Sequence, residues 1–194
     1  MSQKVIQFVG TQRSGSNLLR LMLNQHQGIS APHPPHILRT FMPFLSQYGD
    51  LKVRKNRFLL VDDVCRWVEC NPVEWSSVNF DRDEITDKTT SLLDLFEVIY
   101  QQKCSTDQAK IWCCKSTFNI QYTLELEKAI QPFYIYLYRD GRDVATSFKK
   151  AYVGPKHIYQ IAQKWHREQI ETYSFLSSLA SHRYVWISYE ALIQ

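Results

Sequence analysis

With 194 residues, 44% of them hydrophobic and 22% charged, the chain is long enough for one domain with a sizeable core, and its composition argues against disorder. The formal net charge of +4 is too small for a nucleic-acid-binding surface, although it is compatible with a small anionic ligand. The five cysteines form no C-x-x-C pair, and the N-terminus contains neither a signal peptide nor a membrane-spanning run. We therefore expect a cytoplasmic protein with reduced thiols, no membrane span and no nucleic-acid partner.

The first half of the chain begins with a strand and a helix. The apolar run Val5–Val9, closed by Gly10, predicts a short buried strand. Apolar residues at helical spacing then predict a helix over residues 16–26. Residues 28–38 contain three prolines and are predicted to form a loop without regular structure. For residues 39–90, we expect mostly helical and irregular structure.

The second half of the chain alternates helices and strands. The predicted order is a helix over 92–102, a strand over 110–114, a helix over 122–130, a strand over 133–138, helices over 141–150 and 158–180, and a strand over 184–187. This alternation indicates an α/β domain with a central, mainly parallel sheet, and ligands of such sheets bind at the carboxyl ends of the strands. On the helix over 158–180, the side chains expected to face the core are Ile158, Ile161, Ala162, Trp165, Tyr173 and Leu176.

The first motif lies between the first strand and the first helix. The glycines at 10 and 15 have the spacing of a Walker A loop, where backbone amides and a helix N-terminus bind phosphate. Ser16 and Asn17 stand where that loop carries lysine and a hydroxyl residue for Mg²⁺, and the cation lies inside the loop at Arg13. The loop therefore suits a phosphate-type anion and not metal-dependent nucleotide hydrolysis. The alternative is a capped turn that binds no ligand.

The second motif follows the strand predicted over 133–138. Arg139 ends this strand, at the edge of the sheet where its guanidinium can hold a phosphate with two hydrogen bonds. Asp140 suits the N-cap of the next helix, and Ser147 lies about two turns into it. The alternative is that Arg139 only pairs with Asp143 on the same helix.

Together these motifs resemble those of the sulfotransferases that use 3′-phosphoadenosine 5′-phosphosulfate (PAPS). The run from Arg13 to Leu19 is similar to the family's R-S-G-[ST]-x-L-L loop, and the resemblance implies that Arg13 contacts the sulfuryl group and the bridging oxygen. The residues implied to hold the 5′-phosphate are Ser14, Gly15, Ser16 and Asn17. Arg139 and Ser147 match the pair that binds the 3′-phosphate. Leu18 departs from cytosolic animal members, in which a tryptophan stacks on adenine.

Two weaker features extend the resemblance. The segment Ile111–Thr117 resembles a strand ending in Lys-[ST] in bacterial members, so that Lys115 would offset charge on the transferred or leaving group. The alternative for Lys115 is a surface lysine at a strand end. Tyr189 matches the family's Y-E-x-L segment after the last strand, and the resemblance implies a tyrosine near the adenine.

Two histidines in the proline-rich loop are candidates for the general base that takes the proton of an acceptor hydroxyl. The run Ala31–Leu38 resembles a family loop of the form G-E-P-H-x-L. Pro34 stands at the place of the glutamate, whereas His36 matches the family histidine and His33 is the nearest functional replacement for the carboxylate. An unperturbed imidazole pKa of about 6.5 suits this role. The alternative is that both histidines only pack the loop; as a pair they are too few for a metal site.

The resemblance implies a single sulfotransferase domain over residues 1–194, with a P-loop-like three-layer α/β fold and without the C-terminal helices that the family usually carries. It implies metal-free, in-line sulfuryl transfer from PAPS to a hydroxyl-bearing acceptor, namely a carbohydrate, a lipid or another small molecule. Residues 28–90 should shape the acceptor pocket. The alternatives are a P-loop nucleotide kinase or NTPase and a non-catalytic nucleotide-binding domain.

Overall fold

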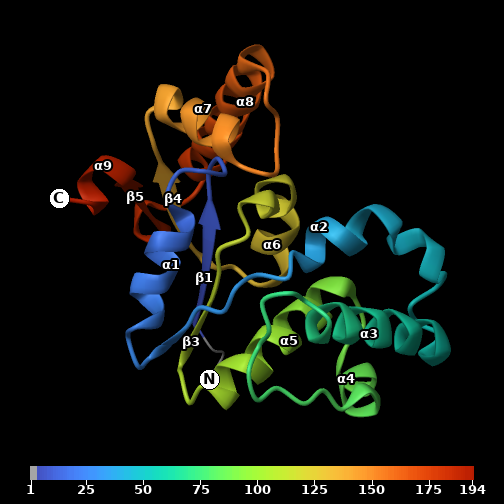
Figure 1. Cartoon of the computed structure of the whole chain (residues 1–194). Coiled ribbons are helices and arrows are strands. Elements are labelled where there is room, and N and C mark those ends of the chain that lie inside the picture. Colours follow the sequence, from blue (N-terminus) through green and yellow to red (C-terminus); the bar gives the residue numbers. More distant parts are fainter. Residues whose placement is uncertain (1–3) are drawn as a thin grey trace.

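The computed structural model describes residues 4–194 and contains a five-stranded sheet with helices on both faces (Figure 1). The strands are β1 (Lys4–Val9), β2 (Ile29–Ser30), β3 (Ile111–Cys114), β4 (Phe133–Tyr138) and β5 (Tyr184–Ser188). The α-helices are α1 (Ser16–Asn24), α2 (Ile37–Phe41), α3 (Arg54–Glu69), α4 (Arg82–Lys88), α5 (Leu92–Thr106), α6 (Thr123–Ala129), α7 (Gly141–Lys150), α8 (Ile158–Ser177) and α9 (Tyr189–Leu192). The 3₁₀ helices are η1 (Met42–Tyr48), η2 (Thr117–Tyr122) and η3 (Ser181–Arg183).

The sheet brings the ends of its strands to one edge. The strand order is β2-β3-β1-β4-β5, and every neighbouring pair is parallel. In the register of the sheet, Gln7 of β1 pairs with Cys114 of β3, and Val9 of β1 pairs with Tyr136 of β4. The segments that follow these strands therefore emerge side by side, as the carboxyl ends of parallel strands must.

The layers follow from the two-residue period of the strands. Phe8 of β1 packs against Leu19 of α1 on one face of the sheet, whereas Val9 packs with Leu176 of α8 on the other. Trp112 of β3 contacts Phe96 of α5, with ring centroids 5.6 Å apart, in the largest part of the core. The predicted three-layer α/β fold with a parallel central sheet is confirmed.

The region between α1 and β3 departs from the prediction in one place. Residues 28–38 were expected to lack regular structure, yet Ile29 and Ser30 form β2 at the edge of the sheet, where Ile29 pairs with Ile111. The prolines begin only at Pro32, so these two residues keep the backbone N–H groups that pairing needs. Helices α2, α3 and α4 with η1 confirm the helical and irregular structure expected for residues 39–90, and Figure 1 shows them gathered with α5 beside the sheet.

The core-facing side of α8 was only partly predicted. Three of the six expected core residues are exposed, namely Ile158, Ala162 and Tyr173. The buried side chains are Ile161, Glu168, Thr172 and Leu176. Two of these, Glu168 and Thr172, are polar. They can be buried because the carboxylate of Glu168 pairs with Lys164 one turn earlier and the Thr172 hydroxyl donates to the Glu168 carbonyl. A search for apolar residues alone therefore missed Glu168 and Thr172, although it found the buried Ile161 and Leu176.

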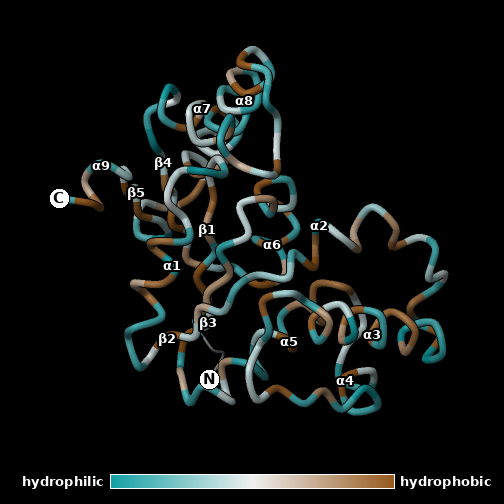
Figure 2. The backbone as a smooth tube through the Cα atoms, in the orientation of Figure 1, coloured by the Kyte–Doolittle hydropathy of each residue, from teal (hydrophilic) through white to brown (hydrophobic). Residues whose placement is uncertain are grey.

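The surface of the helices alternates between polar and apolar residues, as α8 shows in Figure 2. Within residues 4–194 no helix is both long enough and apolar enough to cross a bilayer. The five cysteines are free thiols, and Cys113 and Cys114 are buried in β3.

Candidate functional site

The loop between β1 and α1 is built around two glycines in the left-handed region. Gly10 has φ of 117°, and a Cβ there would lie 2.5 Å from the carbonyl oxygen of Leu137. Gly15, the N-cap of α1, has φ of 92°, and a Cβ there would collide with the ring of Tyr189. Both positions therefore need glycine for backbone conformation and for space.

Side chains from the rest of the protein hold this loop from below. Gln169 of α8 donates to the hydroxyl of Thr11 over 2.8 Å and accepts a hydrogen bond from Tyr136 of β4. Ser14 is completely buried within the loop, and its hydroxyl has no hydrogen-bond partner among the described residues. An unpartnered buried hydroxyl costs free energy, so this loop has a polar atom available for a ligand.

Arg13 stands at the top of the loop in a strained conformation. Its φ is 70°, in the left-handed region that residues other than glycine rarely adopt. Its side chain reaches α7, where Nε donates to the hydroxyl of Ser147 over 3.0 Å. The two sequence motifs, far apart along the chain, are therefore in direct contact.

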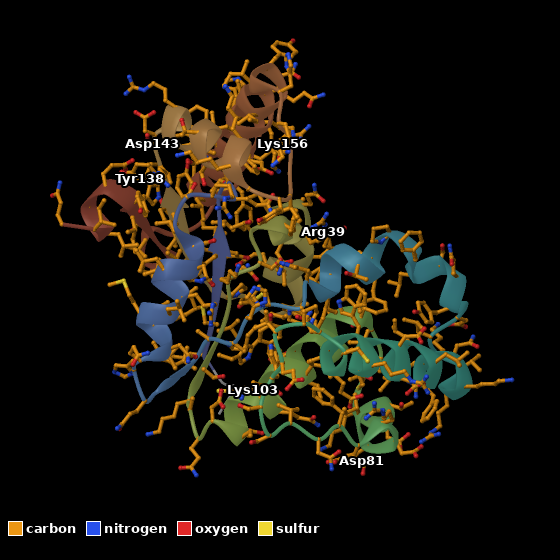
Figure 3. All side chains as sticks on the ribbon, viewed as in Figure 1. Arg39, Asp81, Lys103, Tyr138, Asp143 and Lys156 are labelled. Atoms are coloured by element: carbon orange, nitrogen blue, oxygen red, sulfur yellow. The ribbon has the colours of Figure 1, made fainter. Side chains whose placement is uncertain are left out.

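Arg139 follows β4 and faces the same loop. Its guanidinium lies 4.1 Å above the centre of the Tyr189 ring, and it donates weakly to the Arg13 carbonyl over 3.5 Å. Its Nη2 lies 3.6 Å from the carboxylate of Asp143, whereas Nε is buried without a partner. The ion pair is long and half-exposed, so it leaves much of the hydrogen-bonding capacity of Arg139 free. Figure 3 shows Asp143 on α7, at the end of the molecule where β4 ends.

Asp140 fixes the helix that carries Ser147. Its carboxylate accepts from the backbone N–H of Arg142 over 2.8 Å, which confirms the predicted N-cap of α7. Trp165 of α8 packs against Gly141 and donates its indole N–H to the Arg139 carbonyl over 3.3 Å. The end of β4 and the start of α7 are thus held rigidly.

A cavity of about 360 Å³ opens between these segments. Nine of the eleven candidate site residues line it: Arg13, Gly15, Ser16, Asn17, His36, Lys115, Arg139, Ser147 and Tyr189. The other lining residues, none of which was a candidate site residue, are Gln12, Leu18, Thr117, Phe148 and Val153. Ser14 is buried within the loop and His33 lines another cavity, so neither lines this one. Phe148 directly follows Ser147, and Thr117 directly follows Lys115 and Ser116. Their position next to a motif was the only sequence signal that could have placed them in the site.

The cavity is cationic. Arg13, Lys115 and Arg139 line it, and none of the described residues lining it is acidic. Burial lowers the pKa of Lys115, and the nearby charges of Arg20 and Arg13 lower it further. Three cations in a cavity without an acidic lining residue favour the binding of an anion with several negative charges.

His36 joins this cavity from the start of α2. Its Nδ1 lies 2.8 Å from the hydroxyl of Ser116, and its ring packs edge-on against Phe118. Burial lowers its pKa to about 4, helped by the charges of Lys115, His33 and Arg39. The pKa near 6.5 expected for an unperturbed imidazole is therefore wrong for the ligand-free site, because the sequence did not reveal these neighbours.

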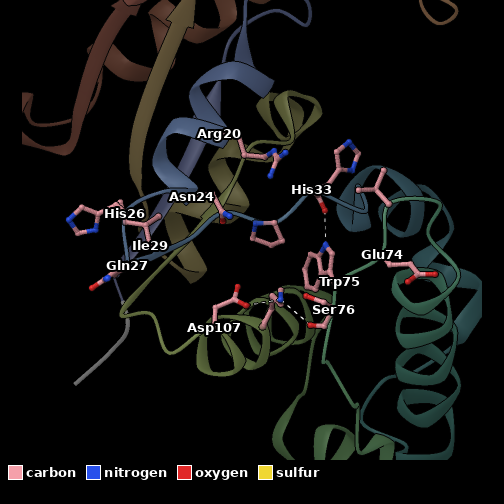
Figure 4. Close-up of a pocket in the computed structure, with 13 residues that line it drawn as sticks. Arg20, Asn24, His26, Gln27, Ile29, His33, Glu74, Trp75, Ser76 and Asp107 are labelled. Carbon is pink, nitrogen blue, oxygen red and sulfur yellow. Dashed lines mark hydrogen bonds and ion pairs between the residues drawn. The ribbon is translucent and has the colours of Figure 1, made fainter.

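His33 lines a second, polar cavity of about 400 Å³ on the other side of α1. Figure 4 shows His33 and Arg20 pointing over this cavity from the loop and from α1, with Trp75 donating to the His33 carbonyl. Burial lowers the pKa of His33 to about 4, with Lys115 and Arg20 adding to the effect. The two candidate bases thus belong to adjacent cavities, with ring centroids 6.4 Å apart. Within residues 4–194 no three His, Cys, Asp or Glu side chains are grouped closely enough to hold a metal ion.

The fold and the site define a class: α/β proteins of P-loop-like architecture with an anion site at the carboxyl ends of the strands. Within it, the chain belongs to the Sulfotransferase family, whose model matches residues 6–194. The sequence resemblance to sulfotransferases is thereby confirmed, and the chain is a transferase by family.

Two solved structures share the fold. A sulfotransferase domain from the curacin biosynthetic pathway superposes with a TM-score of 0.62 at 24% identity, over 99% of this chain and 69% of that one. A sulfotransferase domain from the olefin synthase of Synechococcus PCC 7002 gives a TM-score of 0.65 at 18% identity, over 99% of this chain and 68% of that one. A search of curated proteins found no match. At these sequence identities, the structural similarity to the two domains supports only the fold.

Proposed function

We propose that the protein transfers a sulfuryl group from PAPS to a hydroxyl-bearing acceptor. The observation that carries this proposal is the cavity without acidic lining residues, into which the first loop and the ends of β3 and β4 bring Arg13, Lys115 and Arg139. PAPS presents a 5′-phosphosulfate and a 3′-phosphate, and Arg13 and Arg139 lie on the two segments whose motifs resemble the sites for these groups. Membership of the Sulfotransferase family supports the same reading.

The donor would lie between the β1–α1 loop and the start of α7. The amides of Gly15, Ser16 and Asn17 and the free hydroxyl of Ser14 suit the 5′-phosphate, at the N-terminus of α1. Arg139, with its unpartnered Nε, suits the 3′-phosphate. The Ser147 hydroxyl, which accepts a hydrogen bond from Arg13 Nε, can donate its own proton to the 3′-phosphate and so place Arg13 beside the donor.

The base portion of the donor needs an apolar wall. Leu18, Phe148 and Val153 supply apolar side chains along the same cavity, and the Tyr189 ring lies beneath Arg139. Leu18 replaces the tryptophan of animal relatives, so we propose that adenine packs against this aliphatic and aromatic wall in place of an indole.

Transfer would proceed by in-line attack of the acceptor oxygen on sulfur. As the new O–S bond forms, the S–O bond to the 5′-phosphate breaks, its electron pair stays on the phosphate oxygen, and adenosine 3′,5′-bisphosphate leaves. Arg13 and Lys115 meet the charge that develops on the sulfuryl and bridging oxygens. Nε2 of His36 takes the proton of the acceptor hydroxyl, because His36 is the histidine that lines the donor cavity. The chain supplies all these groups itself, and we propose that no metal takes part.

The acceptor would enter from the polar cavity that contains His33 and Arg20. It is lined partly by Ile29, Pro32, His33 and residues 73–76, within the region expected to shape the acceptor pocket. The ring centroids of His33 and His36 are 6.4 Å apart. Its polar lining suits a hydroxylated small molecule, such as a carbohydrate or the polar head of a lipid.

The experiment that tests the function is a transfer assay with sulfur-labelled PAPS and a panel of carbohydrate, lipid and small-molecule alcohols. We expect label to move to at least one acceptor, with one adenosine 3′,5′-bisphosphate released for each sulfate ester formed. Acceptor-independent hydrolysis of ATP with Mg²⁺ and no transfer from PAPS would favour an NTPase instead. Tight bisphosphate binding without turnover on any acceptor would favour a non-catalytic nucleotide-binding domain.

Arg139→Ala is expected to weaken bisphosphate binding selectively. Loss of a charge-assisted contact costs roughly 1.5–3 kcal/mol, or about 10- to 150-fold in Kd, while AMP, which lacks the 3′-phosphate, should bind with almost unchanged affinity. Isothermal titration of both nucleotides measures the difference. Asp143→Asn is the matched control, because it removes the ion pair of Arg139 and keeps the guanidinium. An Arg139→Ala protein that still prefers the bisphosphate as strongly as the wild type would refute the assignment.

A further inference from the structure

Ser116 is a buried serine whose hydroxyl contacts a histidine of the candidate active site. It follows β3 and Lys115, and only 1% of its surface is exposed. Its Oγ lies 2.8 Å from Nδ1 of His36, which comes from the distant N-terminus of α2. Ser116 does not line the donor cavity, whereas Lys115, Thr117 and His36 do. The serine therefore contacts the His36 ring on the side away from the cavity, and the rest of the ring lines the cavity.

The backbone of Ser116 is itself held by a buried amide network. Its carbonyl accepts from the side-chain amide of Gln7 over 3.2 Å and from the backbone N–H of Asn119 over 3.0 Å. The Asn119 side-chain amide donates to Gln7 over 3.0 Å, and both amides are about 1% exposed. A glutamine in a central strand is costly unless it is hydrogen-bonded, and here its bonds fix the segment that carries Ser116.

The ring of His36 is fixed from its other sides too. His36 is the N-cap of α2 and has φ of 58°, in the left-handed region that residues other than glycine rarely adopt. The Phe118 ring stands nearly perpendicular to the imidazole of His36, with ring centroids 5.1 Å apart. The guanidinium of Arg39 lies 3.7 Å from the centre of the Phe118 ring. With Nδ1 committed to Ser116, Nε2 is the ring nitrogen that remains for the cavity.

The charges around His36 bear on which nitrogen carries its proton. Lys115 of the β3 end, Arg39 of α2 and His33 of the preceding loop all face the ring, and burial with these charges keeps the imidazole neutral, with a pKa of about 4. A neutral imidazole has one protonated and one unprotonated nitrogen. Because the cavity is cationic and lacks a carboxylate, an unprotonated nitrogen with its lone pair toward the cavity is favoured over an N–H there.

We propose that Ser116 is a positioning residue that fixes His36 as the Nδ1–H tautomer. Nδ1–H donates to Ser116 Oγ, and the lone pair of Nε2 is thereby directed to the acceptor's hydroxyl proton. A neutral imidazole takes its tautomer from the hydrogen bond that its other nitrogen makes, and a free imidazole prefers the opposite form, with the proton on Nε2. The part of this proposal that concerns catalysis rests on the proposed role of His36 as the base; the tautomer does not depend on it.

The direct test is long-range ¹H–¹⁵N correlation of the histidine rings in the ¹⁵N-labelled, ligand-free protein near neutral pH. The signals of His36 are assigned by their loss in His36→Gln. We expect Nδ1 to resonate as a protonated nitrogen and Nε2 as an unprotonated one. A wild-type ring with the proton on Nε2, or an even mixture of both forms, would overturn the proposal, and this measurement needs no variant of Ser116 to fold.

Variants of Ser116 test its role separately. In Ser116→Ala the ring should shift toward the Nε2–H form, and kcat should fall about tenfold while the bisphosphate Kd changes by less than about twofold. Ser116→Thr keeps the hydroxyl and should restore the wild-type tautomer. Ser46→Ala, at an exposed serine on η1, is the control and should leave both unchanged. A Ser116→Ala protein with the wild-type tautomer would show that the serine does not set it.

Failure of the proposed function looks different. If the protein moves no sulfuryl group from PAPS but the wild-type ring is the Nδ1–H form and reverts in Ser116→Ala, then Ser116 positions His36 and only the reaction has been misassigned. If transfer occurs and the ring is the Nε2–H form, then the function stands and the positioning role falls.

Discussion

Replacing Arg13 with alanine is expected to lower kcat for sulfuryl transfer by about 10²- to 10³-fold, the loss typical of removing one group that stabilises charge in the transition state. Arg13 is held at the top of the loop with φ of 70° and reaches across the cavity to Ser147. Charge grows on the bridging oxygen as the S–O bond breaks, so a cation fixed there acts on the transition state more than on the ground state. The affinity for the bisphosphate should therefore fall much less than kcat.

Three further variants serve as comparisons for Arg13→Ala. Arg13→Lys keeps a charge without the planar guanidinium and should recover only part of the rate. Lys115→Ala should lower kcat more mildly than Arg13→Ala. Arg66→Ala, at an exposed arginine of α3, should change nothing measurable in the kinetics. A variant at Arg13 that raises only the KM for PAPS, with kcat intact, would make this residue a binding contact and would contradict its proposed role.

His36→Gln is expected to lower kcat by about 10²-fold or more, as removal of a general base does, and to abolish the acidic limb of the pH–rate profile. A base must be unprotonated, so the wild-type rate should fall as pH drops through the pKa of His36. In the free enzyme that pKa is about 4, and kcat/KM for the donor should show its acidic limb there. The limb of kcat should lie at higher pH, because the negative charge of the bound donor stabilises the imidazolium.

Two other histidines serve as comparisons. His33→Gln should raise the KM for the acceptor more than it lowers kcat, because His33 lines the neighbouring cavity. His166→Gln, at an exposed histidine of α8, should leave the profile unchanged. If the acidic limb persists in His36→Gln and disappears in His33→Gln, the roles of the two histidines are reversed. Unchanged profiles in both would remove histidine from the mechanism.

Much of the fold and the donor cavity could be predicted from local sequence. The glycines of the first loop, the arginine after β4 and the N-cap Asp140 each follow from a short pattern with one physical cause. Because the carboxyl ends of parallel strands lie at one edge of the sheet, the loop with Arg13 and the residue Arg139 after β4 were expected at the same edge. The hydrogen bond between Arg13 and Ser147 connects the two motifs at this edge.

The remainder depends on contacts that short patterns do not encode. His33 and His36 are only three residues apart, yet the proline turn between them sends their side chains into different cavities. Their pKa values are lowered first by burial and then by the charge of Lys115, which lies about 80 residues further along the chain and reaches them only through the position of β3 in the sheet. The buried Glu168 shows the same limit in α8, where its partner Lys164 makes a polar residue acceptable in the core.

The measurement that tests the donor assignment most directly is calorimetric titration of the wild-type protein with adenosine 3′,5′-bisphosphate, with AMP and with ATP in the presence of Mg²⁺. We predict that the bisphosphate binds more tightly than AMP by roughly 10- to 150-fold, the equivalent of one charge-assisted contact to the 3′-phosphate, and that ATP with Mg²⁺ binds weakly because the loop has no Walker lysine. Equal affinities for AMP and the bisphosphate would contradict a PAPS site in this cavity.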